Sequence, residues 1–345
     1  MRKKAFLPIL AIFLMLAGCG TPAAEEKSRE IFAMDTFFNL TVSGPQAEDA
    51  LDAAEQEIRR LEKLWSVTQP DSELYAINHS GGVGRLVSLE TMELIAYEVQ
   101  MARQTDGALD PTIYPVLCAW GFTTGEYQVP EQEEIDRLLE SVGYEAIALM
   151  DITVTVPNGA QLDLGAVAKG YTGDRVAELL RNRGITSALL NLGGNVQTIG
   201  SKPDGSKWRI GIRSPYSEGM VGVLEVEDMA VVTSGGYERY FTDDDGNSYW
   251  HILDPDTGYP ARRGLTSVTV VAKEGRQCDA LSTALFVMGL DDATAYWREH
   301  QDFNMVLITE QGEVYLTEGI QDSFELSMSD VPLHIIKLSE LGGNS

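Results

Sequence analysis

The sequence predicts an α+β fold with mainly antiparallel sheet, built as two related α/β halves. Helical and strand-like segments occur in mixed order, without the regular βαβ alternation that is typical of a parallel sheet. Residues 185–271 are rich in short β-like runs that Gly, Pro and Asp interrupt. Each half shows a helix followed by several strands, which is compatible with an old duplication. A chain of 345 residues with 44% hydrophobic residues suits one large domain or two closely packed halves.

The first 18 residues are predicted to be a signal peptide. A basic start at residues 2–4 precedes an apolar stretch at 5–16 that is too short for a comfortable membrane span. Small residues directly before Cys19 resemble the lipobox of bacterial lipoproteins, in which the cysteine is lipidated. The alternative is an ordinary secretory signal that happens to contain a cysteine. Lipidation predicts a chain anchored to the outer face of the bacterial cytoplasmic membrane, with residues 19–29 as a polar tether.

Hydrophobic periodicity predicts the elements that follow. Residues 31–42 alternate like one strand, and residues 46–64 carry apolar side chains at helical spacing. A long loop comes next, and Ser88 caps a second helix that runs to about Gln104. The remaining predicted elements are, in chain order, a turn at 106–111, a helix at 130–143, strands at 146–150, 152–156 and 161–164, a helix at 166–183, the β-rich region, a helix at 277–288, a helix capped by Asp291, and strands at 304–309 and 313–317.

Charge and cysteine content exclude several classes of function. The formal charge of −26 becomes −29 when residues 1–18, with three cations and no anions, are removed. Such a surface repels nucleic acid, so no nucleic-acid partner is expected, and solubility alone explains the acidity. Beyond Cys19 only Cys118 and Cys278 remain, too few for a disulfide framework. None of the four histidines lies at ligand spacing from a cysteine, which argues against zinc.

Four clusters gather reactive or polar residues, three of them together with glycine. The first, at residues 163–171, runs from the end of a predicted strand into the first turn of a helix. The free N–H groups of such a turn favour an anion such as phosphate, and Lys169 adds a positive charge. Taken alone, these residues fit a glycine-containing junction with a solvated lysine better than an anion site.

The second and third clusters are turns. Residues 191–195 place two glycines between β-like runs, which suits a hairpin or the close approach of backbone to a ligand. Residues 251–260 place His251 at a strand end before a Pro/Gly turn, and residues 233–240 upstream add hydroxyls and glycines. Histidine is the usual general base near neutral pH, although an isolated one is more often a surface residue.

The fourth cluster, at residues 279–283, is helical. Asp279 and Thr283 are four residues apart and therefore share a helix face. A carboxylate with a hydroxyl is a weak zinc site but a reasonable Mg²⁺ site, because Mg²⁺ takes few protein oxygens and keeps waters or phosphate oxygens. The alternative is that Asp279 caps the helix N-terminus.

The four clusters, together with the motifs Met34–Asp35–Thr36, residues 70–74 and residues 107–112, resemble the ApbE family of FAD:protein FMN transferases from Met34 to about Gly289. The resemblance implies two related halves with the active site between them. It implies transfer of the FMN moiety of FAD to a Thr or Ser hydroxyl of a target protein, with release of AMP and with Mg²⁺ as cofactor. Implied acceptors are flavin-carrying subunits of membrane redox pumps and related exported flavoproteins.

The resemblance also implies the roles of individual residues. Asp279 and Thr283 would ligate Mg²⁺ through their side chains and Ala166 through its carbonyl, with Ser282 facing the metal. His251 is the implied base, and Lys169 adds to the stabilisation of the phosphates. The residues implied to contact FAD are Met34, Thr68, Ala108, Leu109, Asp110, Asp163, Lys169 and Leu253.

Two departures from the family pattern keep alternatives open. Thr68 stands where an aromatic side chain often stacks on the flavin, and Asp35 stands where Gly is common. One alternative is therefore an FAD pyrophosphatase in which water replaces the hydroxyl acceptor. A second is a lipoprotein that binds flavin without chemistry. The transferase domain is expected at residues 30–325, followed by a C-terminal extension at 326–345.

Overall fold

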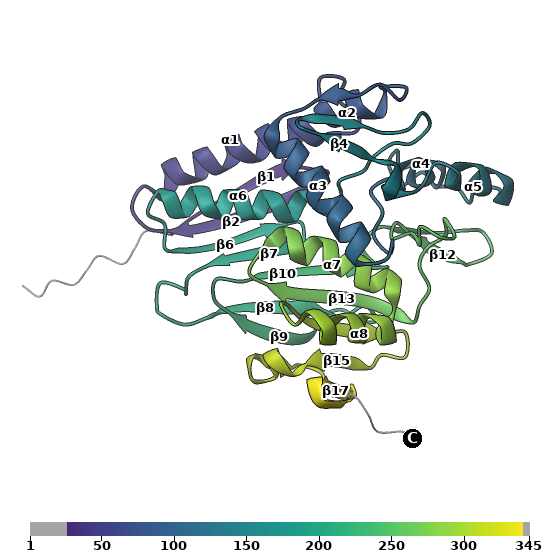
Figure 1. Cartoon of the computed structure of the whole chain (residues 1–345). Helices are drawn as coiled ribbons and strands as arrows, with labels where there is room; N and C mark the ends of the chain where they lie inside the picture. The colour runs from purple at the N-terminus through teal and green to yellow at the C-terminus, as the bar shows by residue number, and fades with distance from the viewer. Residues whose placement is uncertain (1–25, 341–345) are drawn as a thin grey trace, which may run out of the picture.

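A nine-stranded sheet forms the centre of the fold (Figure 1). The computed structural model describes residues 26–340. Every neighbouring pair of strands in the large sheet is antiparallel except β15 and β17. The α+β class with mainly antiparallel sheet is therefore confirmed, whereas the duplication of two halves stays a prediction. The strands are, in sheet order, β1 (Glu26–Ala33), β2 (Thr36–Ser43), β6 (Ser187–Leu192), β7 (Asn195–Ile199), β10 (Ala230–Gly235), β13 (Leu265–Ala272), β14 (Asn304–Thr309), β15 (Val314–Thr317) and β17 (Leu333–Ile336).

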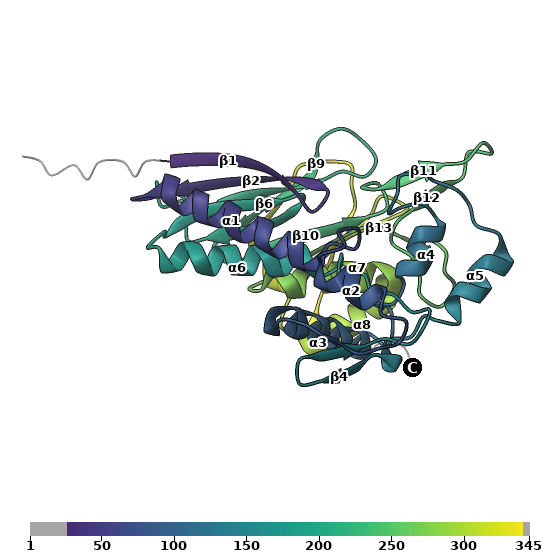
Figure 2. The same ribbon diagram turned by 90° about the horizontal axis from the view of Figure 1, so that it is seen from above.

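Helices pack on one face of this sheet and a smaller sheet packs on the other, as the view from above shows (Figure 2). The helices are α1 (Ala47–Trp65), α2 (Glu73–Asn78), α3 (Leu89–Gln104), α4 (Tyr114–Ala119), α5 (Gln132–Leu139), α6 (Ala168–Asn182), α7 (Gly275–Met288) and α8 (Leu290–His300). Alternation along β10 explains the two faces: Ala230 and Val232 pack in the cluster with α7, whereas Val231 packs against β8 and β9.

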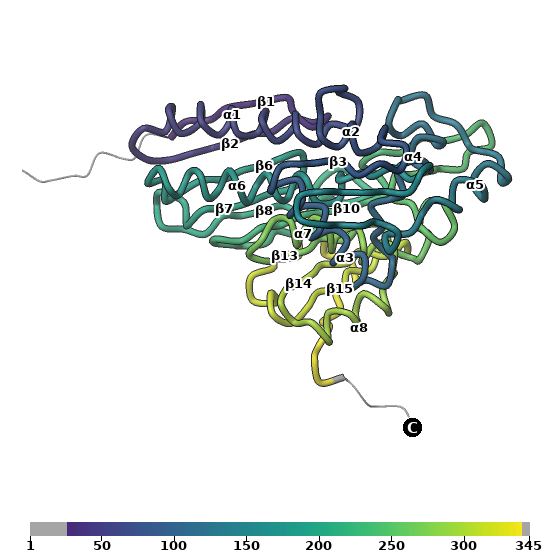
Figure 3. The backbone as a smooth tube through the Cα atoms, turned by 45° about the horizontal axis from the view of Figure 1, so that its top comes forward, coloured from purple at the N-terminus to yellow at the C-terminus, as the bar shows by residue number. Residues whose placement is uncertain are grey.

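Three small sheets complete the fold. Strands β8 (Trp208–Arg213), β9 (Met220–Val226) and β16 (Phe324–Leu326) form one, and β3 (Arg85–Leu86), β5 (Thr153–Thr155) and β4 (Ala148–Met150) form another. The third is the hairpin of β11 (Tyr240–Thr242) and β12 (Ser248–Trp250). Its rings Phe241 and Tyr249 pack with Trp120 into an apolar cluster of α4 and α5, which lie at one end of the molecule (Figure 3).

The prediction of one strand at residues 31–42 is wrong, because β1 and β2 form a hairpin. Met34 and Asp35 are its two-residue loop, and both have positive φ (49° and 59°), as a type I′ turn requires. Phe37 interrupts the alternation because the chain reverses before it, so that Phe32 and Phe37 are cross-strand partners with ring centroids 5.2 Å apart. Asp tolerates the left-handed conformation better than most residues, which accounts for Asp35 where Gly is common.

Other local predictions also need correction. The predicted strand at 161–164 does not form, because the Asn78 side chain provides the hydrogen bonds that a neighbouring strand would offer: its Oδ1 accepts from the Leu162 amide (2.7 Å) and its Nδ2 donates to the Leu162 carbonyl (2.8 Å). Helices α2 and α4 lie in segments predicted as loop or left without an element. Asp291 lies in the first turn of α8 rather than at its cap, which is Gly289.

Both ends of the described chain contribute a strand to the large sheet. Residues 26–29, expected as tether, form the start of β1, where Arg29 makes ion pairs with Glu48 and Asp52 of α1. The signal peptide and Cys19 lie outside the described residues. At the other end, β17 belongs to the segment expected as an extension and adds an edge strand to the large sheet. Within residues 26–340, no helix is both long and apolar enough to cross a membrane.

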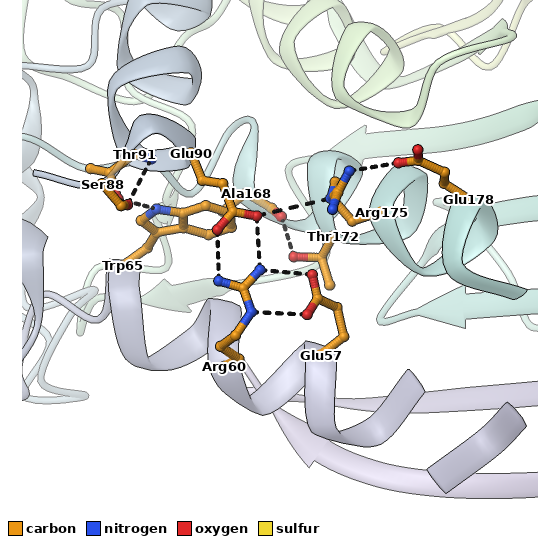
Figure 4. A network of polar contacts seen from close by, with 10 residues as sticks. All are labelled: Glu57, Arg60, Trp65, Ser88, Glu90, Thr91, Ala168, Thr172, Arg175 and Glu178. Atoms are coloured by element: carbon orange, nitrogen blue, oxygen red, sulfur yellow. Dashed lines mark hydrogen bonds and ion pairs between the residues drawn. The ribbon is translucent and has the colours of Figure 1, made fainter. Parts of the chain in front are cut away.

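A polar network joins α1, α3 and α6 (Figure 4). Arg60 of α1 donates to Glu57 on its own helix and to Glu90 of α3, and Arg175 of α6 lies 3.9 Å from the same Glu90. These pairs are partly exposed and contribute little individually. Their effect is to hold three helices in one arrangement beside the first turn of α6, which carries Lys169.

Candidate active site

Helices α6 and α7 touch backbone to backbone at Gly170, where the predicted site residues converge. The Gly170 amide donates to Asp279 Oδ2 at 2.8 Å. A Cβ atom on Gly170 would lie 2.2 Å from the carbonyl oxygen of Gly275, so only glycine fits there. The contact brings the first turn of α6, with Lys169, against the carboxylate of α7.

The hypothesis that Asp279 caps α7 is wrong. The helix begins at Gly275, and the carboxylate of Asp174 accepts from the Gly275 amide (2.6 Å) and from the Arg276 amide (3.0 Å). Asp174 therefore caps α7 by accepting hydrogen bonds from the free N–H groups of its first turn. Asp279 lies one turn further on, is almost fully buried, and directs its carboxylate at α6.

Hydroxyl groups surround Asp279 on the sheet side. Ser282 Oγ lies 2.8 Å from Ser234 Oγ and donates to the Asp279 carbonyl at 2.9 Å. Thr283 Oγ1 lies 3.4 Å from the same Ser234 Oγ. Ser234 lies in β10, whereas the sequence predicts a turn with glycines and hydroxyls here and no role for this residue. Its position on a strand directly under α7 could be inferred only once the sheet order was known.

The carbonyl of Ala166 lies in the segment that leads into α6. In a regular helix the Gly170 amide would donate to this carbonyl, four residues earlier. Here that amide donates to Asp279, and in the described chain no backbone hydrogen bond joins Gly170 to Ala166. The Ala166 carbonyl therefore keeps acceptor capacity in the segment that leads to the Gly170–Asp279 contact, and a carbonyl oxygen of this kind can serve as a cation ligand.

Lys169 lies in the first turn of α6, and Asp163 lies five residues before this helix. Lys169 Nζ donates to the Gly165 carbonyl at 3.1 Å. Burial raises the pKa of Asp163, and the amides of Gly165 and Leu164 and the charges of Lys169 and Arg239 oppose this rise. Arg239 was not predicted as a site residue. It lies in the Thr233–Tyr240 segment, which contains hydroxyls and glycines.

His251 follows β12 and faces the same two cations. Burial, followed by the charges of Arg239 and Lys169, lowers the pKa of His251 to about 4. Its Nδ1 lies 3.2 Å from the Arg239 carbonyl, which can only accept, so Nδ1 carries the proton of the neutral ring. The lone pair is therefore on Nε2. The imidazole is neutral at pH 7 and has the tautomer that a base acting through Nε2 needs.

The residues predicted to contact FAD lie in several segments around this centre. Met34 sits in the β1–β2 turn, and Thr36 beside it limits the space at Gly193 of the β6–β7 hairpin, whose prediction as a turn is confirmed. Ala108 and Leu109 pack in the main core, and Leu253 packs in the aromatic cluster of α4 and α5.

Asp110 and Thr68 contrast in exposure. The Asp110 carboxylate is buried and accepts from the amides of Thr112 (2.8 Å) and Tyr144 (2.9 Å), so its side chain holds two loops together. Thr68 is exposed in the loop after α1, with its amide 3.3 Å from Ser66 Oγ. It presents no ring on which a flavin could stack.

The site combines a carboxylate and nearby hydroxyl and carbonyl oxygens with a lysine at a helix N-terminus and a neutral histidine. These groups are typical of an enzyme that transfers a phosphate-bearing group. A sequence model of the ApbE family matches residues 34–307. The chain belongs to the ApbE family.

Individual relatives agree with this assignment. An FAD:protein FMN transferase of Klebsiella pneumoniae is 35% identical over 268 residues, which cover 76% of this chain and 83% of the relative. One from Treponema pallidum is 31% identical and covers 91% of this chain and 93% of the relative. The crystal structure of the ApbE protein from Thermotoga maritima superposes with a TM-score of 0.82 at 34% identity, covering 87% of this chain and 99% of that chain.

Proposed function

We propose that this chain is an FAD:protein FMN transferase that moves the FMN moiety of FAD to a threonine or serine hydroxyl of another protein. The hydroxyl oxygen forms a bond to the phosphorus of the FMN half, the bond from that phosphorus to the bridging oxygen breaks, and AMP leaves. The observation that carries the proposal is the Gly170–Asp279 contact, because it unites an anion-binding helix N-terminus with the oxygens of α7.

We further propose that the site uses Mg²⁺. Asp279, Thr283 and the Ala166 carbonyl would hold the ion, with Ser282 beside it. The acceptor capacity left at Ala166 and the carboxylate of Asp279 fit a hard cation that keeps waters or phosphate oxygens. Between residues 26 and 340, no group of three or more His, Cys, Asp or Glu side chains is placed to hold a metal ion, so the proposed set uses one carboxylate only. When bound, the ion neutralises phosphate oxygens and polarises phosphorus.

Lys169 and His251 have complementary parts in this proposal. Lys169 and the N-terminus of α6 bind the phosphates, and the fixed charge of Lys169 stabilises the developing negative charge. His251 Nε2 accepts the proton of the attacking hydroxyl. A pKa near 4 makes the free imidazole a weak base. The phosphates of FAD would offset the charges of Arg239 and Lys169 that depress it, so substrate binding strengthens the base.

The deciding experiment is mass spectrometry of an acceptor after incubation with FAD and Mg²⁺. The chemical probe is a flavin-free acceptor domain that contains an accessible threonine, taken from an exported flavoprotein or a membrane redox-pump subunit. We expect a mass increase equal to FMN minus water, together with AMP. Free FMN and AMP without any labelled acceptor would instead identify an FAD pyrophosphatase, the alternative that the exposed, non-aromatic Thr68 favours.

We also propose that Cys19 carries a lipid that anchors the chain to the outer face of the bacterial cytoplasmic membrane. Cys19→Ser is expected to move the protein from the membrane fraction to the soluble extracytoplasmic fraction, because a single residue bears the anchor. Transfer activity of the purified variant should equal that of wild type, since the described site lies in residues 34–283. Membrane retention of the variant in fractionation followed by immunoblotting would contradict lipidation at this residue.

A further inference from the structure

Glu98 is a buried acid without a hydrogen-bond partner, and the proposed mechanism does not use it. It lies in α3 on the face that carries Leu94, Ile95 and Ala102, and its exposed fraction is 1%. Its Oε2 atom is fully enclosed and has no partner. A buried polar atom left unpaired costs about 1–3 kcal/mol, more if it is charged, so its retention in the core needs an explanation.

The surroundings of Glu98 point to the active site. Helix α3 lies against the start of α7, where the Arg276 guanidinium stacks 4.6 Å from the ring centre of Tyr97, the residue next to Glu98. The charges that act on Glu98 belong to Asp163, Asp110 and Asp279, from three different segments of the site. Burial, followed by these carboxylates, raises the pKa of Glu98 well above its usual value. The acid therefore faces negative charge and lacks a positive counterpart.

A cation beside Asp279 would supply that counterpart. The described residues include no cluster of three or more acidic or other ligating side chains close enough to share one metal ion, so Glu98, Asp163 and Asp279 do not all ligate directly. Mg²⁺ keeps several water molecules when it binds to proteins, and these waters donate hydrogen bonds. An enclosed carboxylate oxygen that has no partner, and on which the charge of Asp279 acts, is a fitting acceptor for such a water.

We propose that Glu98 completes the cation site from the side of α3, as a positioning residue that accepts hydrogen bonds from the water held by the bound Mg²⁺. The inference rests on the proposed function, because it requires a divalent cation at Asp279. It assigns to α3 a part in metal binding and makes this helix, which contributes no proposed ligand, a determinant of metal affinity.

The test is the affinity of the purified mature chain for Mg²⁺, measured by calorimetric titration, with the metal-induced rise in Tm as a second readout. Glu98→Gln keeps the shape and removes the charge, and should weaken Mg²⁺ binding about 10- to 100-fold. Glu98→Asp should fall between this variant and wild type. Glu93→Gln, the same change at an exposed position of α3, is the matched control and should bind as wild type.

The outcomes separate the inference from the proposed function. Wild-type affinity in Glu98→Gln, with binding lost in Asp279→Asn, would overturn the role of Glu98 and leave the metal site intact. Absence of Mg²⁺ binding in the wild-type chain would overturn the metal site itself. Because each variant is compared with and without Mg²⁺, a general loss of stability does not imitate the effect. If Glu98→Gln does not fold, wild-type affinity in Glu98→Asp overturns the inference.

Discussion

Replacement of His251 by Ala is expected to lower FMN transfer by about 10²–10⁴-fold at pH 7 while FAD binding persists. The expected loss follows from the Nε2 lone pair, which the hydrogen bond between Nδ1 and the Arg239 carbonyl leaves free. Binding should persist because the phosphates are held by Lys169 and the start of α6. Single-turnover transfer to the acceptor, with FAD affinity measured by fluorescence, separates the two effects. Full transfer activity in the variant would remove His251 from the mechanism.

The pH dependence of the wild-type enzyme tests the same residue. Because the pKa of His251 is lowered from 6.5 to about 4, the neutral form needed by a base persists well below pH 6 in the free enzyme. As the pH is lowered, kcat/KM should therefore fall with the pKa of His251 in the free enzyme, near 4. The corresponding fall in kcat should occur at a higher pH, because the bound phosphates raise the pKa of His251. If kcat/KM instead fell with the ordinary pKa of histidine, 6.5, the cations would not act on His251.

The same shift affects folding stability. Between pH 6.5 and about 4 the unfolded chain binds a proton at His251 that the folded chain excludes. Stability is therefore fully present above pH 6.5 and falls as the pH drops toward 4. In His251→Ala this part of the acid-induced loss should disappear, so the difference in stability between variant and wild type should itself depend on pH in this window.

Periodicity predicted the fold class and most long elements because these depend on local patterns. Ser88 caps α3 as predicted, and its Oγ accepts from the Thr91 amide at 3.3 Å. Periodicity failed where a side chain or a turn replaced regular pairing. Asn78 takes the place of a strand beside Leu162, and Met34 and Asp35 reverse the chain within what looks like a single alternating run. Both features depend on single residues, and a hydrophobic pattern taken over a stretch of sequence does not detect them.

The sequence predicts those site residues whose own side chains would bind the metal or phosphate or transfer a proton. Asp279, Lys169 and His251 were identified from their types and settings, and their segments do converge. Arg239 and Glu98 were missed because their importance arises from residues distant in the chain. One signal for Glu98 is present in the sequence. It occupies the apolar face of α3, between Leu94 and Ala102, where burial of a charged side chain is unfavourable unless it has a partner.

The Gly170→Ala variant is expected to lose stability and transfer activity together. Its Cβ would lie 2.2 Å from the Gly275 carbonyl oxygen and 2.7 Å from the Arg276 amide nitrogen, which are backbone atoms that no rotamer change can move away. Helices α6 and α7 must then separate. Overpacking of this kind costs about 1–3 kcal/mol and sometimes more. The separation would also break the 2.8 Å hydrogen bond that holds the Asp279 carboxylate against the first turn of α6.

Gly173→Ala is the matched control, one turn further along α6. There the nearest atom to a new Cβ is the end of the Gln197 side chain at 3.1 Å, which can give way, and alanine favours a helix over glycine by about 1 kcal/mol. We therefore expect Gly173→Ala to keep its Tm and its activity, and Gly170→Ala to lose both. Thermal denaturation with and without Mg²⁺ adds the decisive comparison: the metal-induced rise in Tm should shrink only in Gly170→Ala. If both variants behaved like wild type, the close contact of α6 and α7 would not be what assembles the site.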